Sequence, residues 1–137
     1  MTRRMQSAFS LAERPLPEVL ARIRRGLPAS MFHQIAATLG LSTSVLAAKL
    51  GIARRTLIRK HGTGAPLSSE ASEKVLRVAR ICNLARALFA TDEAISQWLF
   101  KADSALGNAA PIDLLDTELG AREVEALVRS LSHGQFV

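Results

Sequence analysis

Apolar residues recur along most of this 137-residue chain at the three- and four-residue spacing of an amphipathic helix. The strict two-residue alternation of a half-buried β-strand is hard to find. Prolines, glycines and hydroxyl-bearing residues divide the pattern into about eight expected helices. Apart from a central pair within 43–62, their expected ranges are 17–26, 29–40, 68–89, 91–100, 111–115 and 117–134. The sequence therefore predicts an all-α protein.

The central segment 43–62 has the spacing of a helix-turn-helix. Ala47 is small where two helices must approach closely, and Gly51 supplies a turn position without a Cβ penalty. The residues expected to pack the two helices together are Val45, Leu46, Leu50, Ile52 and Leu57. The remaining polar and cationic residues then face outward, as on a recognition helix in a DNA major groove. The candidate DNA-binding residues are Thr43, Ser44, Arg54, Arg55, Thr56, Arg59 and Lys60.

Position along the second helix assigns different roles to its cations. Arg54 and Arg55 lie near its N-terminus, where base edges are reached, so we expect them to influence sequence choice. Arg59 and Lys60 lie further along and are expected to meet phosphates. A single such helix covers little DNA, so we expect a homodimer on a two-fold operator site. The alternative is an ordinary helical hairpin with a solvated basic face.

The charge of the chain is unevenly distributed. Residues 1–61 hold eleven Lys/Arg and two Asp/Glu, a balance of +9, whereas residues 62–137 hold seven and ten, a balance of −3. A polyanion is therefore attracted to the first part and mildly repelled by the second. Because the excess coincides with the helix-turn-helix, the charge favours DNA binding over a merely solvated face.

Nothing in the sequence indicates catalysis, a cofactor or a metal site. His33, His61 and His133 lie on different expected elements, without neighbours at metal-ligand spacing. Cys82 is the only cysteine, so no intrachain disulfide is possible, which favours a reducing cytoplasm. No apolar run approaches the ~20 residues needed to span a bilayer. We therefore expect neither an enzyme nor a membrane protein.

Three segments are expected along the chain. Residues 1–16 carry arginines but no continuous apolar stretch, so they are no secretory signal. They are expected to form a flexible basic arm that either touches the DNA backbone or is simply disordered. Residues 17–66 are expected to form the DNA-binding subdomain. Residues 67–137 are expected to form a long connecting helix and a C-terminal helical subdomain.

The long helix has polar residues at every third position: Lys74, Arg77, Arg80, Asn83 and Arg86. At about 100° per residue each step falls about 60° short of a full turn, so the polar stripe winds about half-way round the helix. Its apolar face therefore points in nearly opposite directions at the two ends. We infer that the helix joins the two subdomains, and a dimer interface along it is the competing explanation.

The C-terminal third contains a more specific string of residues. It consists of Trp98-Leu99, Leu106-Gly107, Pro111-Ile-Asp113-Leu114-Leu115, Thr117 and Gly120, followed by the apolar stripe Val124, Leu127 and Leu131. Together with the helix-turn-helix, this string resembles the Xre/MbcA/ParS-type antitoxins of bacterial toxin–antitoxin modules, over about residues 30–137. The chain departs from the family pattern at Asn108-Ala-Ala, where the family often has another glycine before the proline.

The resemblance implies an antitoxin of a type II toxin–antitoxin module. Such antitoxins bind a cognate RES-domain toxin, which degrades NAD, and repress their own operon through the helix-turn-helix, often with the toxin in a higher-order complex. In the family a C-terminal segment covers the entrance to the toxin's active site, and in this chain that segment is about 106–137. The candidate toxin-binding residues are Leu106, Gly107, Pro111, Asp113, Leu114, Thr117, His133, Gly134, Gln135, Phe136 and Val137.

The last residues carry a separate signal. Phe136 and Val137 follow a helix-stopping Gly134, and each would contribute about 1–2 kcal/mol if a partner pocket buried it. The alternative for this tail is that it folds back or frays. The alternative for the whole chain is a stand-alone transcriptional regulator whose C-terminal domain dimerises or senses a ligand.

Overall fold

The computed structural model of the chain describes residues 7–133. Within that range the chain forms eight α-helices, two short 3-10 helices and one isolated β-bridge, but no strand. The elements are α1 (Ala8–Leu11), α2 (Leu16–Arg25), α3 (Ala29–Thr38), α4 (Thr43–Leu50), α5 (Arg54–Thr63), α6 (Ser69–Ala85), α7 (Asp92–Leu99), η1 (Ser104–Leu106), η2 (Pro111–Leu114) and α8 (Glu118–Ser132). The predicted all-α class is confirmed.

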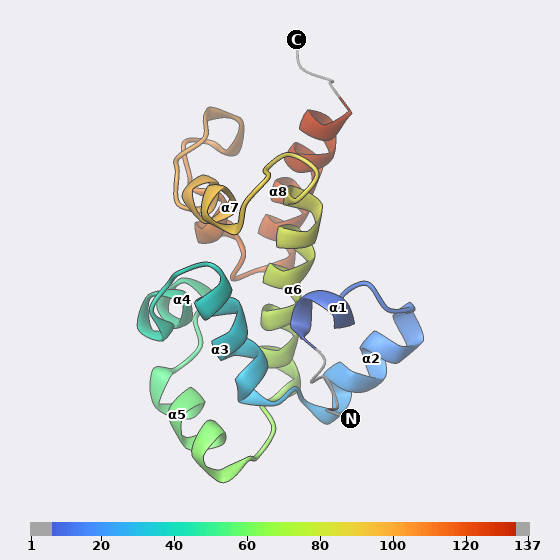
Figure 1. Ribbon diagram of the computed structural model, residues 1–137, viewed down its shortest axis with the longest axis vertical. Coiled ribbons are helices and arrows are strands. Elements are labelled where there is room, and N and C mark those ends of the chain that lie inside the picture. The colour runs from blue at the N-terminus through green and yellow to red at the C-terminus, as the bar shows by residue number, and fades with distance from the viewer. Residues whose placement is uncertain (1–6, 134–137) are drawn as a thin grey trace.

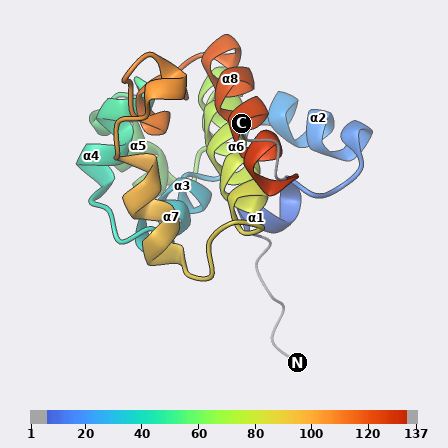
Figure 2. The same ribbon diagram turned by 90° about the horizontal axis from the view of Figure 1, so that it is seen from above.

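The long helix α6 is the centre of the structure. It runs along the long axis of the molecule, and α1, α2, α3 and α8 pack around it (Figures 1 and 2). Nine of its 17 residues are buried within the chain, which leaves little of its surface for a second copy. α6 is therefore largely enclosed by other helices of the same chain.

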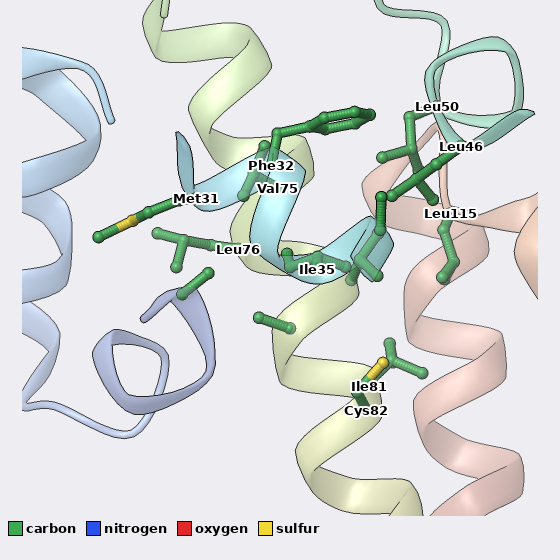
Figure 3. Close-up of a cluster of buried hydrophobic side chains, with 14 of the residues drawn as sticks. Met31, Phe32, Ile35, Leu46, Leu50, Val75, Leu76, Ile81, Cys82 and Leu115 are labelled. Carbon is green, nitrogen blue, oxygen red and sulfur yellow. The ribbon is translucent and has the colours of Figure 1, made fainter. Parts of the chain in front are cut away.

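One hydrophobic core serves both parts of the chain. Figure 3 shows side chains from α3 and α4 meeting α6 and Leu115, the residue that follows η2. The side chains labelled there are Met31, Phe32, Ile35, Leu46, Leu50, Val75, Leu76, Ile81, Cys82 and Leu115. The helix-turn-helix and the C-terminal part are therefore packed together rather than strung on a linker.

Three residues of the polar stripe contact three different elements, as the winding of the stripe predicts. Asn83 donates a hydrogen bond of 2.8 Å to a backbone carbonyl of α1. The Arg80 guanidinium lies 3.0 Å from the Glu118 carboxylate of α8, and that of Arg86 lies 2.7 Å from the Asp92 carboxylate of α7. The stripe thus joins the N-terminal helices to both C-terminal ones.

The expected end of the long helix, near Phe89, is wrong by four residues, because α6 ends at Ala85. The following turn includes hydrogen bonds between residues three apart instead of four: the N–H of Leu88 donates to the Ala85 carbonyl at 2.9 Å. Arg86 and Leu88 are good helix formers, so local propensity extends the prediction. Tertiary contacts end the helix instead, since the Phe89 ring lies 5.7 Å from the Trp98 ring of α7.

Residues 1–16 were expected to form a flexible arm, but from Ser7 onward the chain is folded. α1 packs against α6, and Ala8 and Leu11 are fully buried there. The Ser7 hydroxyl caps α1 by accepting the Ser10 N–H at 3.1 Å. A four-residue helix is too short to be predicted from its own sequence, because its stability comes from packing against α6. Residues 1–6 lie outside the described range.

No single helix among residues 7–133 is both long and apolar enough to cross a membrane. A bent pair, Ala29–Thr38 with Thr43–Leu50, meets the criteria of length and composition at an angle of 111°.

Candidate functional sites

The turn of the helix-turn-helix is built on Gly51. Its backbone is left-handed, with φ of 68° and ψ of 34°, a conformation that glycine adopts without steric cost. The Gly51 N–H donates to the Ala48 carbonyl at 3.3 Å, and the Ile52 N–H donates to the Ala47 carbonyl at 3.0 Å. This pair of bonds is a Schellman motif, which ends α4 and directs the chain into α5.

Packing then fixes which side of α5 faces outward. Leu57 is fully buried and Ile52 nearly so, and α5 packs against α3 and α4. Arg54, Arg55 and Arg59 are exposed. In Figure 1, α5 lies at the lower end of the molecule, far from α7. The structure thus displays α5 as an accessible helix.

The cations of α5 are free of acidic partners. Among the ion pairs and hydrogen bonds of residues 7–133, none involves the side chain of Arg54, Arg55, Arg59 or Lys60; only the carbonyls of Arg59 and Lys60 take part, as acceptors from the Thr63 hydroxyl. Lys60 and Thr56 are half-buried, so they lie at the edge of the exposed face. A group of unpaired guanidinium ions on one helix face is suited to a polyanion.

The two hydroxyl candidates at the start of α4 differ in availability. Ser42, not Thr43, is the cap, and its hydroxyl accepts the Val45 N–H at 3.1 Å. The Thr43 hydroxyl lies 3.3 Å from His33 Nδ1, so it is occupied within the protein, whereas Ser44 is exposed. Burial lowers the pKa of His33, and the nearby His61 at the end of α5 lowers it further. The ring centroids of these histidines are 4.7 Å apart.

Sequence reasoning missed two apolar residues of the helix-turn-helix. Val45 was expected to pack between the helices, but its exposed fraction is 44%, because α4 turns Leu46, Ala47 and Leu50 inward instead. Ile58 was not singled out, and it is 57% exposed on α5 among the arginines. Helical periodicity assigns a face only when the direction of the core is known, and the sequence alone does not supply that direction.

The basic region extends beyond α5. The last turn of α2 carries Arg22, Arg24 and Arg25. The chain that follows α2 adjoins the chain that follows α5, because the Leu67 N–H donates to the Leu27 carbonyl at 2.8 Å. The cations in the last turn of α2 therefore lie towards the same end of the molecule as α5.

The C-terminal part begins with a compact loop between α7 and η2. The Asp103 N–H donates to the Ala109 carbonyl at 3.1 Å, and the Asn108 N–H donates to the Asp103 carbonyl at 2.9 Å. Asn108 has a φ of 67°, alone among the non-glycine residues of the described chain in having a positive φ. Asparagine tolerates this conformation better than most other residues with a Cβ. The loop can therefore form although the chain lacks the glycine that the family often has here.

Several candidate toxin-binding residues hold η2 against α8. The Thr117 hydroxyl caps α8 by accepting the Gly120 N–H at 3.0 Å. A Cβ on Gly120 would lie only 2.1 Å from the Leu114 carbonyl oxygen, so the close approach of η2 to α8 requires glycine there. Pro111 is buried. Buried Pro111 therefore shapes the segment from within, whereas Leu114 is half-buried and Thr117 acts from the surface.

The other candidates reach the surface. Gly107 and His133 are exposed, and Leu106 is half-buried. Asp113 is exposed but paired, with its carboxylate 2.7 Å from Lys49 Nζ of α4. Leu119, which sequence reasoning did not single out, is 71% exposed on α8. The candidates Gly134, Gln135, Phe136 and Val137 lie outside the described residues.

An ion-pair network that the sequence did not reveal ties α8 to α6. Glu118 lies 3.1 Å from Arg77 Nε and 3.0 Å from Arg80 Nη2. Arg77 is buried, and its guanidinium also donates to the Leu115 carbonyl at 3.1 Å. Burial alone would raise the pKa of Glu118, but the hydrogen bonds and charges of the two arginines outweigh it and hold the pKa below its ordinary value. This network fixes the start of α8.

The described residues contain no group of three or more His, Cys, Asp or Glu that could hold a metal ion. Cys82 is fully buried in α6, and burial raises the pKa of its thiol to about 12. The thiol is therefore protonated at neutral pH and acts as a core residue, as predicted, rather than as a nucleophile.

Comparison with known proteins identifies two domains in the chain. Residues 18–80 match the antitoxin Xre-like helix-turn-helix domain, and residues 84–134 match the antitoxin Xre/MbcA/ParS C-terminal toxin-binding domain. The chain is 31% identical to the "Prs ADP-ribosylating antitoxin" of Sphingobium sp. over 123 residues, which cover 83% of this chain and 77% of the relative. This chain belongs to the Xre/MbcA/ParS antitoxin family.

Two relatives named "Antitoxin Xre" are also similar to the chain. The protein of Yersinia enterocolitica is 36% identical over 63% of this chain and 59% of its own length. That of Photorhabdus laumondii is 27% identical over 86% of this chain and 80% of its own length. The chain is thus an antitoxin with a DNA-binding and a toxin-binding domain, and it is not an enzyme.

The family matches divide the structure inside α6. The helix-turn-helix match covers α2 to the middle of α6, and the toxin-binding match starts near the end of α6 and covers α7 and α8. In this antitoxin both domains therefore include part of α6.

Proposed function

We propose that this antitoxin inhibits a RES-domain toxin that degrades NAD and represses its own operon through α5. The observation that carries the proposal is the placement of the two surfaces. The unpaired cations of α5 lie at one end of the molecule, and α7 with the last turns of α8 lies at the other (Figure 1). A chain built this way holds a toxin and DNA at the same time.

For DNA binding, α5 enters the major groove with Arg54 and Arg55 towards the bases. Arg59, Lys60 and the basic last turn of α2 then contact phosphates. Because α5 has only ten residues, one copy contacts few base pairs, so we propose a homodimer on a two-fold operator site. Such binding places the antitoxin in the cytoplasm with the DNA.

For toxin binding, segment 106–137 covers the entrance of the NAD cleft. The exposed surface that supports this is contributed by Leu106, Gly107, Asp113, Leu119 and His133. Pro111 supports the segment from within, and Leu114 and Thr117 hold η2 against the start of α8. We also propose that Phe136 and Val137, which lie outside the described residues, enter the cleft, because apolar side chains gain stability when a partner buries them.

The experiment uses the gene next to that of the antitoxin. Its product should be toxic when expressed alone and harmless when expressed with this chain. NAD should disappear from cells in the first case and persist in the second. Toxicity without NAD loss would contradict the proposed toxin chemistry, and failure of the chain to relieve toxicity would contradict the pairing.

A second toxin chemistry is favoured by one observation. The name of the Sphingobium relative refers to ADP-ribosylation of Prs. The alternative is therefore a toxin that transfers ADP-ribose from NAD to a protein. NAD labelled in its ADP-ribose part separates the two reactions, because transfer leaves the label on protein whereas hydrolysis releases it in a small molecule.

A further inference from the structure

Ile58 is an unusual residue for its position on α5. Four large apolar side chains of the described residues are exposed, and Ile58 is the one that α5 contributes. The buried residue of α5 is its neighbour Leu57, about 100° away around the helix. Ile58 therefore faces away from the core, on the side that carries the arginines.

Helical spacing places Ile58 in a defined row. Residues four apart lie on one face, so Arg54, Ile58 and Gly62 form a row beside the row of Arg55 and Arg59. A Cβ built on Gly62 would meet nothing within 4 Å, so the space one turn beyond Ile58 is open. The row thus offers a guanidinium, then a branched apolar group, then bare backbone.

Single exposed apolar residues are common on protein surfaces and need no explanation by themselves. Ile58 differs because it lies in the middle of a cationic helix face. A protein-docking surface would need a larger apolar area, whereas the exposed side chains around Ile58 are those of Arg54, Arg55, Arg59 and His61. The surroundings therefore favour a partner that is polyanionic and presents one small apolar group.

Thymine in double-stranded DNA has that chemistry. Its C5-methyl group lies in the major groove and is absent from the other bases. We propose that Ile58 contacts a thymine methyl group and makes the antitoxin select thymine at that position. This inference rests on the proposed binding of α5 in the major groove. Arg54 lies one turn earlier, about 6 Å along the helix axis, so a guanine that it contacts is about two base pairs away.

The test replaces thymine with deoxyuridine, which lacks only the methyl group. A footprint in the DNA directly upstream of the antitoxin gene defines the probe, and duplexes carrying one deoxyuridine at each thymine in turn are titrated at constant salt. At one position in each half-site the wild-type affinity should fall about three- to tenfold. Ile58→Ala should bind the thymine duplex with that same reduced affinity and no longer distinguish deoxyuridine from thymine there.

Two controls separate this contact from other effects. Leu16→Ala removes a side chain that is 67% exposed on α2, and it should retain full affinity and full discrimination. The salt dependence of binding should be equal for wild type and Ile58→Ala, because no phosphate contact is lost. Ile58→Val keeps the branched side chain, so it should retain most of the discrimination and shows that the fold tolerates substitution there.

The outcomes distinguish this inference from the proposed function. A wild-type protein that binds the footprint but is insensitive to deoxyuridine at every thymine overturns the role of Ile58 alone. So does discrimination that persists unchanged in Ile58→Ala. If Ile58→Ala instead alters the oligomeric state or toxin binding, Ile58 belongs to a protein interface and the proposed thymine contact is also overturned. Absence of any sequence-selective DNA binding by the wild type overturns the proposed function and this inference together.

Discussion

Replacing Gly120 with alanine should destabilise this antitoxin, although alanine is the better helix former. A Cβ at position 120 would lie 2.1 Å from the Leu114 carbonyl oxygen and 3.0 Å from the Leu114 Cβ. The first atom belongs to the backbone of η2, so the contact is relieved only if η2 moves away from α8. Overpacking of this kind costs about 1–3 kcal/mol, against up to about 1 kcal/mol gained in helix propensity. We expect a net loss of about 1–2 kcal/mol.

Gly62 provides a matched control for this substitution. It is also a helical glycine, in α5, but a Cβ there would meet nothing within 4 Å. Gly62→Ala should therefore raise the free energy of unfolding by about 0.5–1 kcal/mol through helix propensity alone. The two variants carry the same chemical change, so their opposite signs isolate the contact between η2 and α8.

Urea denaturation followed by circular dichroism measures both variants against wild type, with stability taken by linear extrapolation. The thermal midpoint should move by roughly 3–5 °C for each kcal/mol in a chain of this size. Because η2 carries Asp113 within the toxin-binding domain, Gly120→Ala should also weaken toxin inhibition. A Gly120→Ala protein as stable as Gly62→Ala would refute the reasoning from the close approach.

Three other outcomes are expected. Arg54→Ala combined with Arg55→Ala should abolish gel shifts with the upstream DNA while leaving inhibition of toxin NAD hydrolysis unchanged, and loss of inhibition in this folded variant would contradict two separate surfaces. Removal of residues 135–137 should weaken inhibition without moving the thermal midpoint, and superimposable inhibition curves would show that the tail takes no part. The pKa of Glu118 is held below its ordinary value, so its ion pairs contribute their full stability at pH values above the ordinary pKa. That contribution is lost as the pH falls through the lowered pKa. Glu118→Gln should therefore be less stable than wild type at neutral pH, and the difference should shrink as the pH is lowered. Glu123→Gln, a substitution of an exposed residue, should follow wild type. Parallel curves of unfolding free energy against pH for all three proteins would exclude the network as the cause.

Local signals explain which parts of the fold were predictable. Ser68, Thr91 and Thr117 each precede a helix and cap it through the side chain, which the sequence indicates by a hydroxyl followed by acidic residues. Gly51 likewise identifies the turn between α4 and α5 from its residue type alone. These features depend on neighbours within a few positions, so the sequence carries them in full.

The features that the sequence did not reveal depend on distant neighbours. Arg77 and Glu118 are 41 residues apart, and the same arginines were predicted only as part of a polar stripe. α1 is helical because α6 covers Ala8 and Leu11. Pro111 fits the family string, yet its burial shows that a residue can belong to a functional motif by supporting its shape. In each case tertiary packing supplies the information.

The two surfaces of the antitoxin are separate, but the fold beneath them is not. The Lys49–Asp113 ion pair joins α4 to η2 at 2.7 Å, and both side chains are exposed enough that the pair adds little stability by itself. The stronger connection is apolar, because Leu46 and Leu50 of α4 share one core with Leu115 and α6 (Figure 3). Substitutions at surface residues of α5 or segment 106–137 can therefore remove one activity at a time. Substitutions in the shared core lower the stability of both domains together, since neither the helix-turn-helix nor the toxin-binding domain has a core of its own.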